Sequence, residues 1–308
     1  MLPRIKIALR VPDTESSNRF FYFRLRSNLY TEPCEYKAVS KLFVVSDVES
    51  NFQNFCKLLI KHKIIDKYLN WIFGEGHLVI LGNCFSQNEQ KTECLWFIYS
   101  LEEKALSKGG YVHFILGDHE IMHIDGSWLY KHPPYALATP SLRVAPTALY
   151  NANYELRRWL ETKNIMEKIG TLLFVHGGIS TKINELKYSI SDLNILARSF
   201  YLRLHKLVFN DDHQMALFTS EEAPYRYNGY YNGNAKKPQV NFTLAKFNVE
   251  RIITGHTIQE QISYFFDTKV INVATDHTKG NSEGLLINKG LLFRADRQGR
   301  KEKFRCKK

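Results

Sequence analysis

The chain has 308 residues, a hydrophobic fraction of 44% and a formal net charge of +11. This length can bury a large core, as one elaborated domain or as two smaller ones, and the ordinary hydrophobic fraction argues against a disordered or a membrane protein. Residues 294–308 contain eight Lys/Arg and two Asp/Glu, so they carry six of the eleven net positive charges. A terminal basic run of this kind is usually a solvated tail.

The cysteine pattern and the start of the chain are informative about the cellular compartment of the protein. The five cysteines are an odd number, and they show neither a Cys-x-x-Cys pair nor a spacing typical of zinc sites. This pattern indicates reduced thiols. The N-terminus has no apolar stretch long enough for a signal peptide, and no later run approaches transmembrane length. We therefore expect a cytoplasmic protein without a membrane partner.

Residues 1–40 are predicted to be an N-terminal extension, with a strand or hairpin at the alternating aromatics of residues 20–23. From residue 42 strands and helices alternate, which predicts parallel strands joined by right-handed crossovers. The elements expected here are strands that end at residues 46 and 81, helices over 52–63 and 93–106, and a strand that starts near residue 112.

A Pro-rich stretch over 125–165 with an amphipathic helix at 150–162 follows, and then a helical segment over 191–208. Long ordered excursions of this kind often cover a site. After residue 250 the pattern predicts strands at 251–254, 262–266, 269–273, 284–288 and 291–295. We expect a two-sheet core with helices outside, formed by a domain over 41–295 and followed by a basic tail over 296–308.

Five of the apolar strands run directly into a glycine or serine and then into a polar residue of a type that binds metals. Strands buried on both faces appear as continuous apolar runs, and such sheets bind ligands beyond the carboxyl ends of their strands. The sequence therefore predicts one polar site at these ends. The polar residues are Asp47, Asn83, Asp118, His176 and His256.

These motifs resemble those of the calcineurin-like metallophosphoesterase family, the superfamily of the metal-dependent Ser/Thr protein phosphatases, over about residues 42–295. Residues 51–59, 92–96, 112–122 and 175–180 are similar to a bacterial branch of that family. The resemblance implies an α/β fold, a four-layer α/β/β/α sandwich with two mixed sheets. It also implies hydrolysis of phosphoesters with two divalent metals bridged by one aspartate.

The resemblance also assigns roles to individual residues. The metal-ligand positions are Asp47, Glu49, Asn83, Asp118, His176 and His256, and His119 is the histidine expected to protonate the leaving group. Three of these positions depart from the family motifs. Glu49 replaces the histidine of Asp-x-His, Asn83 replaces the bridging aspartate, and Asp118 replaces the asparagine of Gly-Asn-His-Glu.

These departures predict a degenerate metal site. A bridge between two dications needs two anionic oxygens on one group, and the neutral amide of Asn83 cannot supply them. One divalent metal, Mn, Fe or Zn, is chemically reasonable at Asp118, His176 and His256, with Asn83 as an additional ligand. A second metal is not expected.

The motifs for phosphate binding are weakened as well. In the family an aspartate orients the catalytic histidine and an arginine clamps the phosphate, and the corresponding residues here are Ser86 and Gln87. A second family arginine falls on Asn228, with Arg226 nearby. The candidate substrate-binding residues are therefore Arg226, Asn228 and Gln87.

Three functions remain open from the sequence. The first is a pseudoenzyme with weak or absent phosphoester hydrolysis that binds a phosphorylated small molecule or a phosphoprotein. The second is an active phosphomonoesterase, or metallophosphatase, that uses one metal or a rearranged pair. The third is a structural or nucleic-acid-associated protein that uses the basic tail. The remaining histidines, His277 among them, are interpreted as structural.

Overall fold

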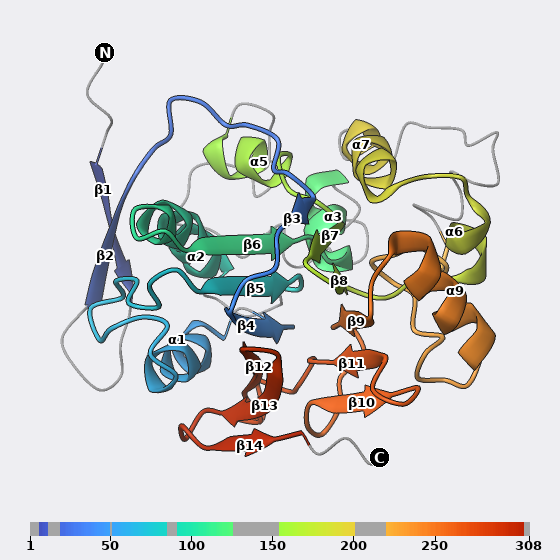
Figure 1. Cartoon of the computed structure of the whole chain (residues 1–308). Helices are drawn as coiled ribbons and strands as arrows, with labels where there is room; N and C mark the ends of the chain where they lie inside the picture. The colour runs from blue at the N-terminus through green and yellow to red at the C-terminus, as the bar shows by residue number, and fades with distance from the viewer. Residues whose placement is uncertain are drawn as a thin grey trace.

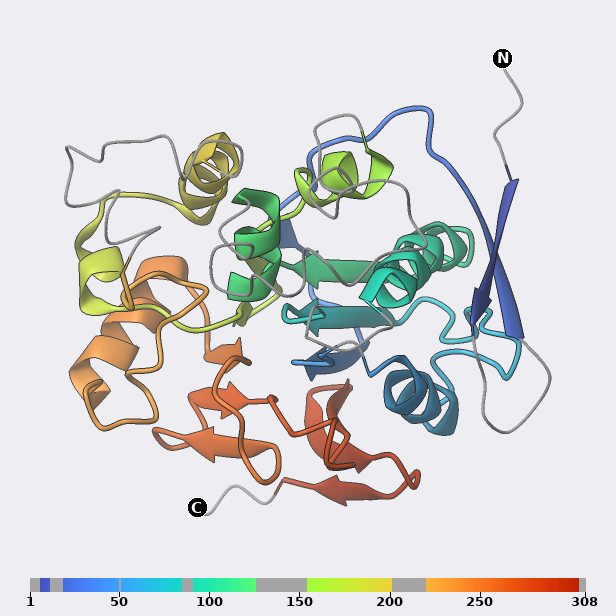
Figure 2. The same ribbon diagram turned by 180° about the vertical axis from the view of Figure 1, so that it is seen from behind.

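The computed structural model describes residues 6–11, 19–49, 51–84, 91–125, 154–200 and 220–304. Two mixed six-stranded sheets lie face to face, with helices on their outer sides (Figure 1). Seen from behind, the same layers are visible in Figure 2, with α1 and α2 beside one sheet and α6 and α9 beside the other. The predicted sandwich with two mixed sheets is confirmed.

The first sheet has the strand order β14-β13-β12-β4-β5-β6. Its parallel part, β4, β5 and β6, is joined by the crossover helices α1 and α2, as the alternating pattern predicts. Its antiparallel part is formed by the last three strands of the chain. The bounds are β4 Lys41–Ser46, α1 Phe52–Lys61, β5 His77–Leu81, α2 Lys91–Leu106, β6 Tyr111–Ile115, β12 Glu283–Asn288, β13 Leu291–Asp296 and β14 Lys301–Lys303.

The second sheet has the strand order β10-β11-β9-β8-β7-β3. Strands β8, β9 and β11 are parallel neighbours, and β7 and β8 form an antiparallel pair. The bounds of its strands are β3 Glu35–Tyr36, β7 Met166–Ile169, β8 Leu172–Val175, β9 Arg251–Thr254, β10 Ser263–Phe265 and β11 Val270–Asn272. The remaining helices are α3 Asp118–Asp125, α5 Glu155–Leu160, α6 Thr181–Glu185, α7 Ile190–Phe200 and α9 Lys237–Phe247.

Alternation of side chains along the strands explains the layers. In β4, Phe43 and Val45 belong to the core between the first sheet and its helices, whereas Leu42 and Val44 belong to the core between the two sheets. All four side chains are buried. Both faces of the strand are therefore apolar, which is why the sequence shows a continuous apolar run.

The sequence pattern missed several elements. Strands β3 and β7 and helix α9 were not predicted, and the helix expected over 150–162 is the shorter α5. Strand β14 lies in the segment predicted as a basic tail. Its three residues are exposed and pair through the backbone with β13, so they carry no apolar signal. The parts of the predicted helices and of the Pro-rich stretch at 126–153 and 201–208 lie outside the described residues.

The N-terminal segment packs on the main core. Strand β1 (Lys6–Val11) pairs with β2 (Arg19–Arg24), which confirms the predicted hairpin. The ring of Phe23 stacks on Trp96 of α2 at 4.7 Å between centroids. Lys163, 1% exposed, donates hydrogen bonds to Glu32 at 2.8 Å and to Glu102 at 2.7 Å. This buried cation thus links the segment that precedes β3 to α2.

A polar chain that is buried at His113 and Glu167 connects the two sheets. His113 of β6 lies 2.7 Å from Glu167 Oε2 of β7 through Nδ1, and 2.8 Å from His77 Nδ1 through Nε2. Burial lowers the pKa of His113 to about 3 and raises the pKa of Glu167 to about 8. The pair is therefore neutral near pH 7, with the carboxylic acid of Glu167 donating to His113 Nδ1.

None of the helices in the described part of the chain is both long and apolar enough to span a bilayer. Within the same residues, Cys34, Cys56, Cys84 and Cys94 take part in no disulfide bond.

Candidate functional site

The residues that follow the strands adopt an uncommon backbone conformation. The φ angle is positive at Asp47 (52°), Glu49 (48°), Asn83 (52°) and His256 (63°). Asp, Asn and His tolerate this left-handed conformation better than most residues do. It reverses the chain directly after β4, β5 and β9, and it brings polar side chains to the carboxyl edges of both sheets.

Glycines allow these edges to approach each other closely. A Cβ atom at Gly255 would lie 1.8 Å from Ser46 Oγ, and one at Gly117 would lie 2.6 Å from Asn83 Oδ1. Neither separation is possible for a real side chain, so only glycine fits at these positions. The contact between the ends of β4 and β9 therefore joins the two sheets at one site, as the sequence predicts.

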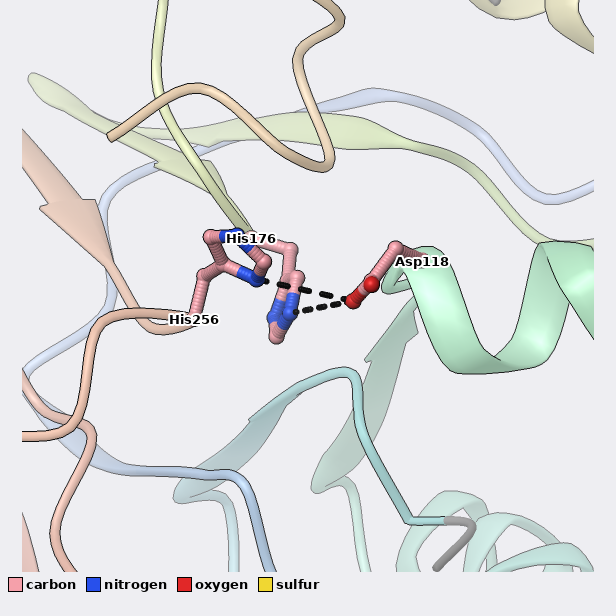
Figure 3. Close-up of side chains that lie close together, drawn as sticks. All are labelled: Asp118, His176 and His256. Atoms are coloured by element: carbon pink, nitrogen blue, oxygen red, sulfur yellow. Dashed lines mark ion pairs between the residues drawn. The ribbon is translucent and has the colours of Figure 1, made fainter. Parts of the chain in front are cut away.

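Three side chains meet at this site (Figure 3). Asp118 Oδ1 lies 3.4 Å from His176 Nε2 and 3.5 Å from His256 Nδ1. Each of these three atoms is buried and has no hydrogen-bond partner. The other ring nitrogen of His176, Nδ1, donates to the backbone oxygen of Leu81 at 2.6 Å, which directs Nε2 toward Asp118.

The electrostatics of the three residues fit a bound cation. Burial lowers the pKa of His176, but the carboxylates of Asp47 and Asp118 outweigh it and raise the pKa to about 9. Burial likewise raises the pKa of Asp118, and contact with His176 and His256 outweighs it, so this pKa lies well below its usual range. Without a metal, a proton on His176 balances the charge of Asp118, and a cation would replace that proton.

One carboxylate and two imidazoles suit Mn, Fe or Zn. Their donor atoms all lie within 4.8 Å of one another, and no other three His, Cys, Asp or Glu side chains of the described residues do so. We call Asp118, His176 and His256 the metal group. Three of the six predicted ligands thus come together in a form that fits a metal.

The other three predicted ligands lie beside the metal group and have other contacts. Asp47 Oδ1 accepts a hydrogen bond from Asn83 Nδ2 at 3.0 Å, and Asp47 Oδ2 accepts one from the backbone N–H of His256 at 2.9 Å. Glu49 donates its backbone N–H to Asn83 O at 2.9 Å. Burial and the charge of Asp47 raise the pKa of Glu49. Ligand roles for Asp47, Glu49 and Asn83 remain predictions.

His119, the predicted proton donor, is the second residue of α3. Its backbone N–H donates to Asn83 Oδ1 at 3.3 Å, and its side chain is partly buried. It follows Asp118 directly, so His119 and the carboxylate of the metal group belong to one turn of helix. His119 is therefore held next to the metal group by the same helix start that carries Asp118.

Glu120 holds two segments of the site together, a role that the sequence pattern did not indicate. It is fully buried, and its carboxylate accepts hydrogen bonds from the backbone N–H groups of Asn83 and Gly117, both at 2.9 Å, and of Cys84 at 2.8 Å. It fixes the loop after β5 to the start of α3. The sequence feature that could have indicated this role is the position of Glu120 at the end of the Gly117–Glu120 motif.

His277 is a second residue whose surroundings the sequence did not indicate. It lies on the loop after β11, it is 1% exposed, and neither ring nitrogen has a hydrogen-bond partner in the described part of the chain. Burial lowers its pKa to about 4, although the nearby charge of Asp47 acts in the opposite direction. His277 is thus a neutral imidazole at the edge of the site.

Two of the three predicted substrate-binding residues, Arg226 and Asn228, lie on the loop that covers Gly177. The backbone N–H groups of Gly177 and Gly178 donate to Pro224 O at 2.8 and 2.9 Å, so this loop rests on the residue after His176. Arg226 is partly buried, and no carboxylate of the described residues pairs with it. Asn228 Oδ1 accepts a hydrogen bond from Asn232 Nδ2 at 2.8 Å. Ser86 and Gln87 lie outside the described residues.

Solved structures and curated proteins similar to this chain include several phosphatases. The cold-active protein-tyrosine phosphatase of a psychrophilic Shewanella species is 30% identical, with a TM-score of 0.84 over 97% of this chain and 98% of that one. A protein serine/threonine phosphatase from Saccharomyces cerevisiae, 13% identical with a TM-score of 0.55, shares the fold.

Shewanella-like protein phosphatase 1 of Plasmodium berghei is 25% identical over 243 residues, which are 77% of this chain and 66% of that protein. An uncharacterised protein of Schizosaccharomyces pombe is 23% identical over 226 residues, or 71% of this chain and 67% of that protein. The chain thus spans about two thirds of the length of these curated relatives. The sequence profile of the calcineurin-like phosphoesterases matches residues 40–260. The chain therefore belongs to the calcineurin-like phosphoesterase family.

Proposed function

We propose that this chain is a metal-dependent phosphomonoesterase that acts on phosphoproteins and holds one divalent metal, Mn, Fe or Zn, at Asp118, His176 and His256. The observation that carries the proposal is the metal group itself, in which three buried donor atoms without partners converge at the carboxyl edges of both sheets. Phosphoprotein substrates are supported by similarity to proteins that are named protein phosphatases.

The metal would polarise the phosphoryl group and supply positive charge to the transition state. His119 is proposed to protonate the leaving oxygen as a general acid, which is worth about 10²–10⁴ in rate. Its backbone is fixed by Asn83 Oδ1, and this restricts where the imidazole can reach. The charge of His119 acts to lower the pKa of Glu49, against burial and the charge of Asp47, so the two groups are within electrostatic range of each other. Glu49 is therefore proposed as the carboxylate that orients His119, since position 86 carries a serine.

Arg226 is the favoured candidate for binding the phosphate. A guanidinium offers a planar fork of donors that matches phosphate oxygens, and a site for an anion needs a cation that is not already neutralised. Arg226 meets this condition within the described residues, whereas Asn228 offers a phosphate only the donors of a neutral amide. Gln87 stays a prediction from the sequence.

A second candidate function, a pseudoenzyme that binds a phosphorylated ligand without turnover, is favoured by one observation. Asn83, at the bridging position of the family, is neutral and donates to Asp47 instead of offering two anionic oxygens. A cytoplasmic location remains an expectation from the cysteine pattern.

The test is hydrolysis of p-nitrophenyl phosphate and of peptides that carry phosphoserine, phosphothreonine or phosphotyrosine, with Mn²⁺ and with chelator. We expect metal-dependent turnover that falls at least 100-fold in Asp118→Asn and is unchanged in Asp267→Asn, a matched change at an exposed aspartate on the β10–β11 turn. Phosphopeptide binding without turnover would favour the pseudoenzyme. Absence of metal binding, phosphopeptide binding and turnover together would exclude both candidates.

A further inference from the structure

A continuous path of hydrogen bonds joins four of the five chain segments that carry the site. It runs from the backbone N–H of His256 to Asp47 Oδ2 (2.9 Å), from Asp47 Oδ1 to Asn83 Nδ2 (3.0 Å), and from Asn83 Oδ1 to the backbone N–H of His119 (3.3 Å). We call the two central side chains, Asp47 and Asn83, the carboxylate–amide cross-link. It ties the ends of β4, β5 and β9 to the start of α3.

Both oxygens of Asp47 are occupied by protein donors. Besides Asn83 and the backbone of His256, the hydroxyl of Ser46 lies 2.6 Å from Asp47 Oδ2. Asp47 is 2% exposed and Asn83 is 4% exposed, so water does not compete for these bonds. A carboxylate bonded in this way is already satisfied. It differs from the carboxylate of Asp118, whose Oδ1 has no hydrogen-bond partner.

The amide at position 83 decides what can lie between the two side chains. Two ionised carboxylates at 3.0 Å would repel each other and would need a cation or a shared proton between them. One carboxylate and one amide can instead bond directly, because Nδ2 is a donor. The same two positions therefore suit either a metal or a direct hydrogen bond, and this chain has the residues for the hydrogen bond.

We propose that the carboxylate–amide cross-link takes the structural place of a second metal, so that Asp47 is a positioning residue for His256 and His119 and is not a metal ligand. The inference rests on the proposed function only in its placement of the single metal at the metal group. The charge that Asn83 lacks is supplied by Asp118, which faces both histidines. With a carboxylate at position 118 and an amide at position 83, the negative charge lies in the metal group. The space between Asp47 and Asn83 is then taken by their hydrogen bond and is not available to a second metal.

Metal stoichiometry, measured by elemental analysis after dialysis against Mn²⁺ or Zn²⁺, is the first test. We expect one metal in the wild-type chain, no stoichiometric metal in Asp118→Asn, and one metal with about tenfold weaker affinity in Asp47→Asn, since loss of an outer hydrogen bond weakens metal binding by about 10–100-fold. The two variants make the same chemical change at two aspartates. Two metals in the wild type, or equal loss of metal in both variants, would overturn the inference.

Thermal unfolding in chelator tests the cross-link without metal or substrate. Asn83→Asp opposes two carboxylates and Asp47→Asn removes a donor–acceptor pair, so each should lower the Tm by about 3–6 °C. The double variant Asp47→Asn/Asn83→Asp reverses the direction of the bond and should recover at least half of the loss. If the Tm of the double variant falls by the sum of the two single losses or by more, the cross-link is refuted. Absence of turnover in a wild-type chain that passes both tests would refute only the proposed function.

Discussion

Glu167→Gln is predicted to stabilise the protein at alkaline pH. Glutamine has the shape of the protonated carboxylic acid, so its Nε2 can donate to His113 Nδ1 while its oxygen accepts from Asn164 Nδ2, as Glu167 Oε1 does at 2.8 Å. The substitution therefore keeps the hydrogen bonds of the neutral chain and removes a group that ionises. In the wild type, ionisation of Glu167 stabilises the unfolded state at alkaline pH, and the variant loses this stabilisation of the unfolded state.

The magnitude follows from linkage. The unfolded chain loses the Glu167 proton near pH 4.5, whereas the folded chain keeps it until about pH 8 because burial raises the pKa. Between these values the unfolded state binds fewer protons, so stability falls as the pH rises. Each pH unit in that interval costs about 1.4 kcal/mol, which amounts to about 5 kcal/mol at pH 8. For a chain of this size, Glu167→Gln should then raise the Tm at pH 8 by about 5–10 °C.

The assay is calorimetric unfolding at pH 5, 6.5 and 8, with Glu185→Gln at an exposed position of α6 as the matched control. Burial lowers the pKa values of His77 and His113 from 6.5 to about 4 and about 3, so the unfolded state binds more protons than the folded state below about pH 6.5. The stability of the protein therefore falls with the pH below this value, and this loss at acid pH should be the same in Glu167→Gln. A lower Tm of Glu167→Gln at pH 8, or an unchanged alkaline slope, would show that Glu167 is ionised in the folded state.

Three further outcomes are expected. His119→Gln should lower kcat at least about 100-fold while elemental analysis finds the metal retained, and loss of the metal would argue against a proton-donor role. Lys163→Met removes a buried cation from the partly buried carboxylate of Glu32 and from the buried carboxylate of Glu102, which keeps Arg26. It should cost about 3 kcal/mol in urea unfolding, and a cost below about 1 kcal/mol would contradict this reasoning. Gly255→Ala should abolish metal binding because its Cβ would meet Ser46 Oγ, whereas Gly290→Ala, in open space, should retain the metal.

The strands could be predicted where burial on both faces produced a continuous apolar run. The strands that end at Ser46, Leu81 and Val175 have this pattern, and they end where the sequence indicates. Strands β3 and β14 could not be predicted. They join the sheets through backbone hydrogen bonds at an edge, and such bonds do not require apolar side chains.

The candidate site could be predicted as a set of residues but not as an arrangement. Six ligand positions are visible in the sequence because each follows a strand, and the parallel ends of strands meet at one edge. Which of them face a metal depends on distances below 4 Å between segments that are up to about 200 residues apart. Asp118, His176 and His256 come together, while Asp47 and Asn83 bond to each other.

The sequence by itself predicted the family-type fold and the polar residues at the strand ends, with an amide at position 83 and a carboxylate at position 118, because these depend on residue type and on order along the chain. The tertiary structure alone decided which partners these side chains have. The direction of a hydrogen bond depends on the orientation of each side chain, and the left-handed turns at Asp47 and Asn83 set that orientation. The protonation of buried groups such as Glu167 likewise depends on burial by distant segments, which no local pattern encodes.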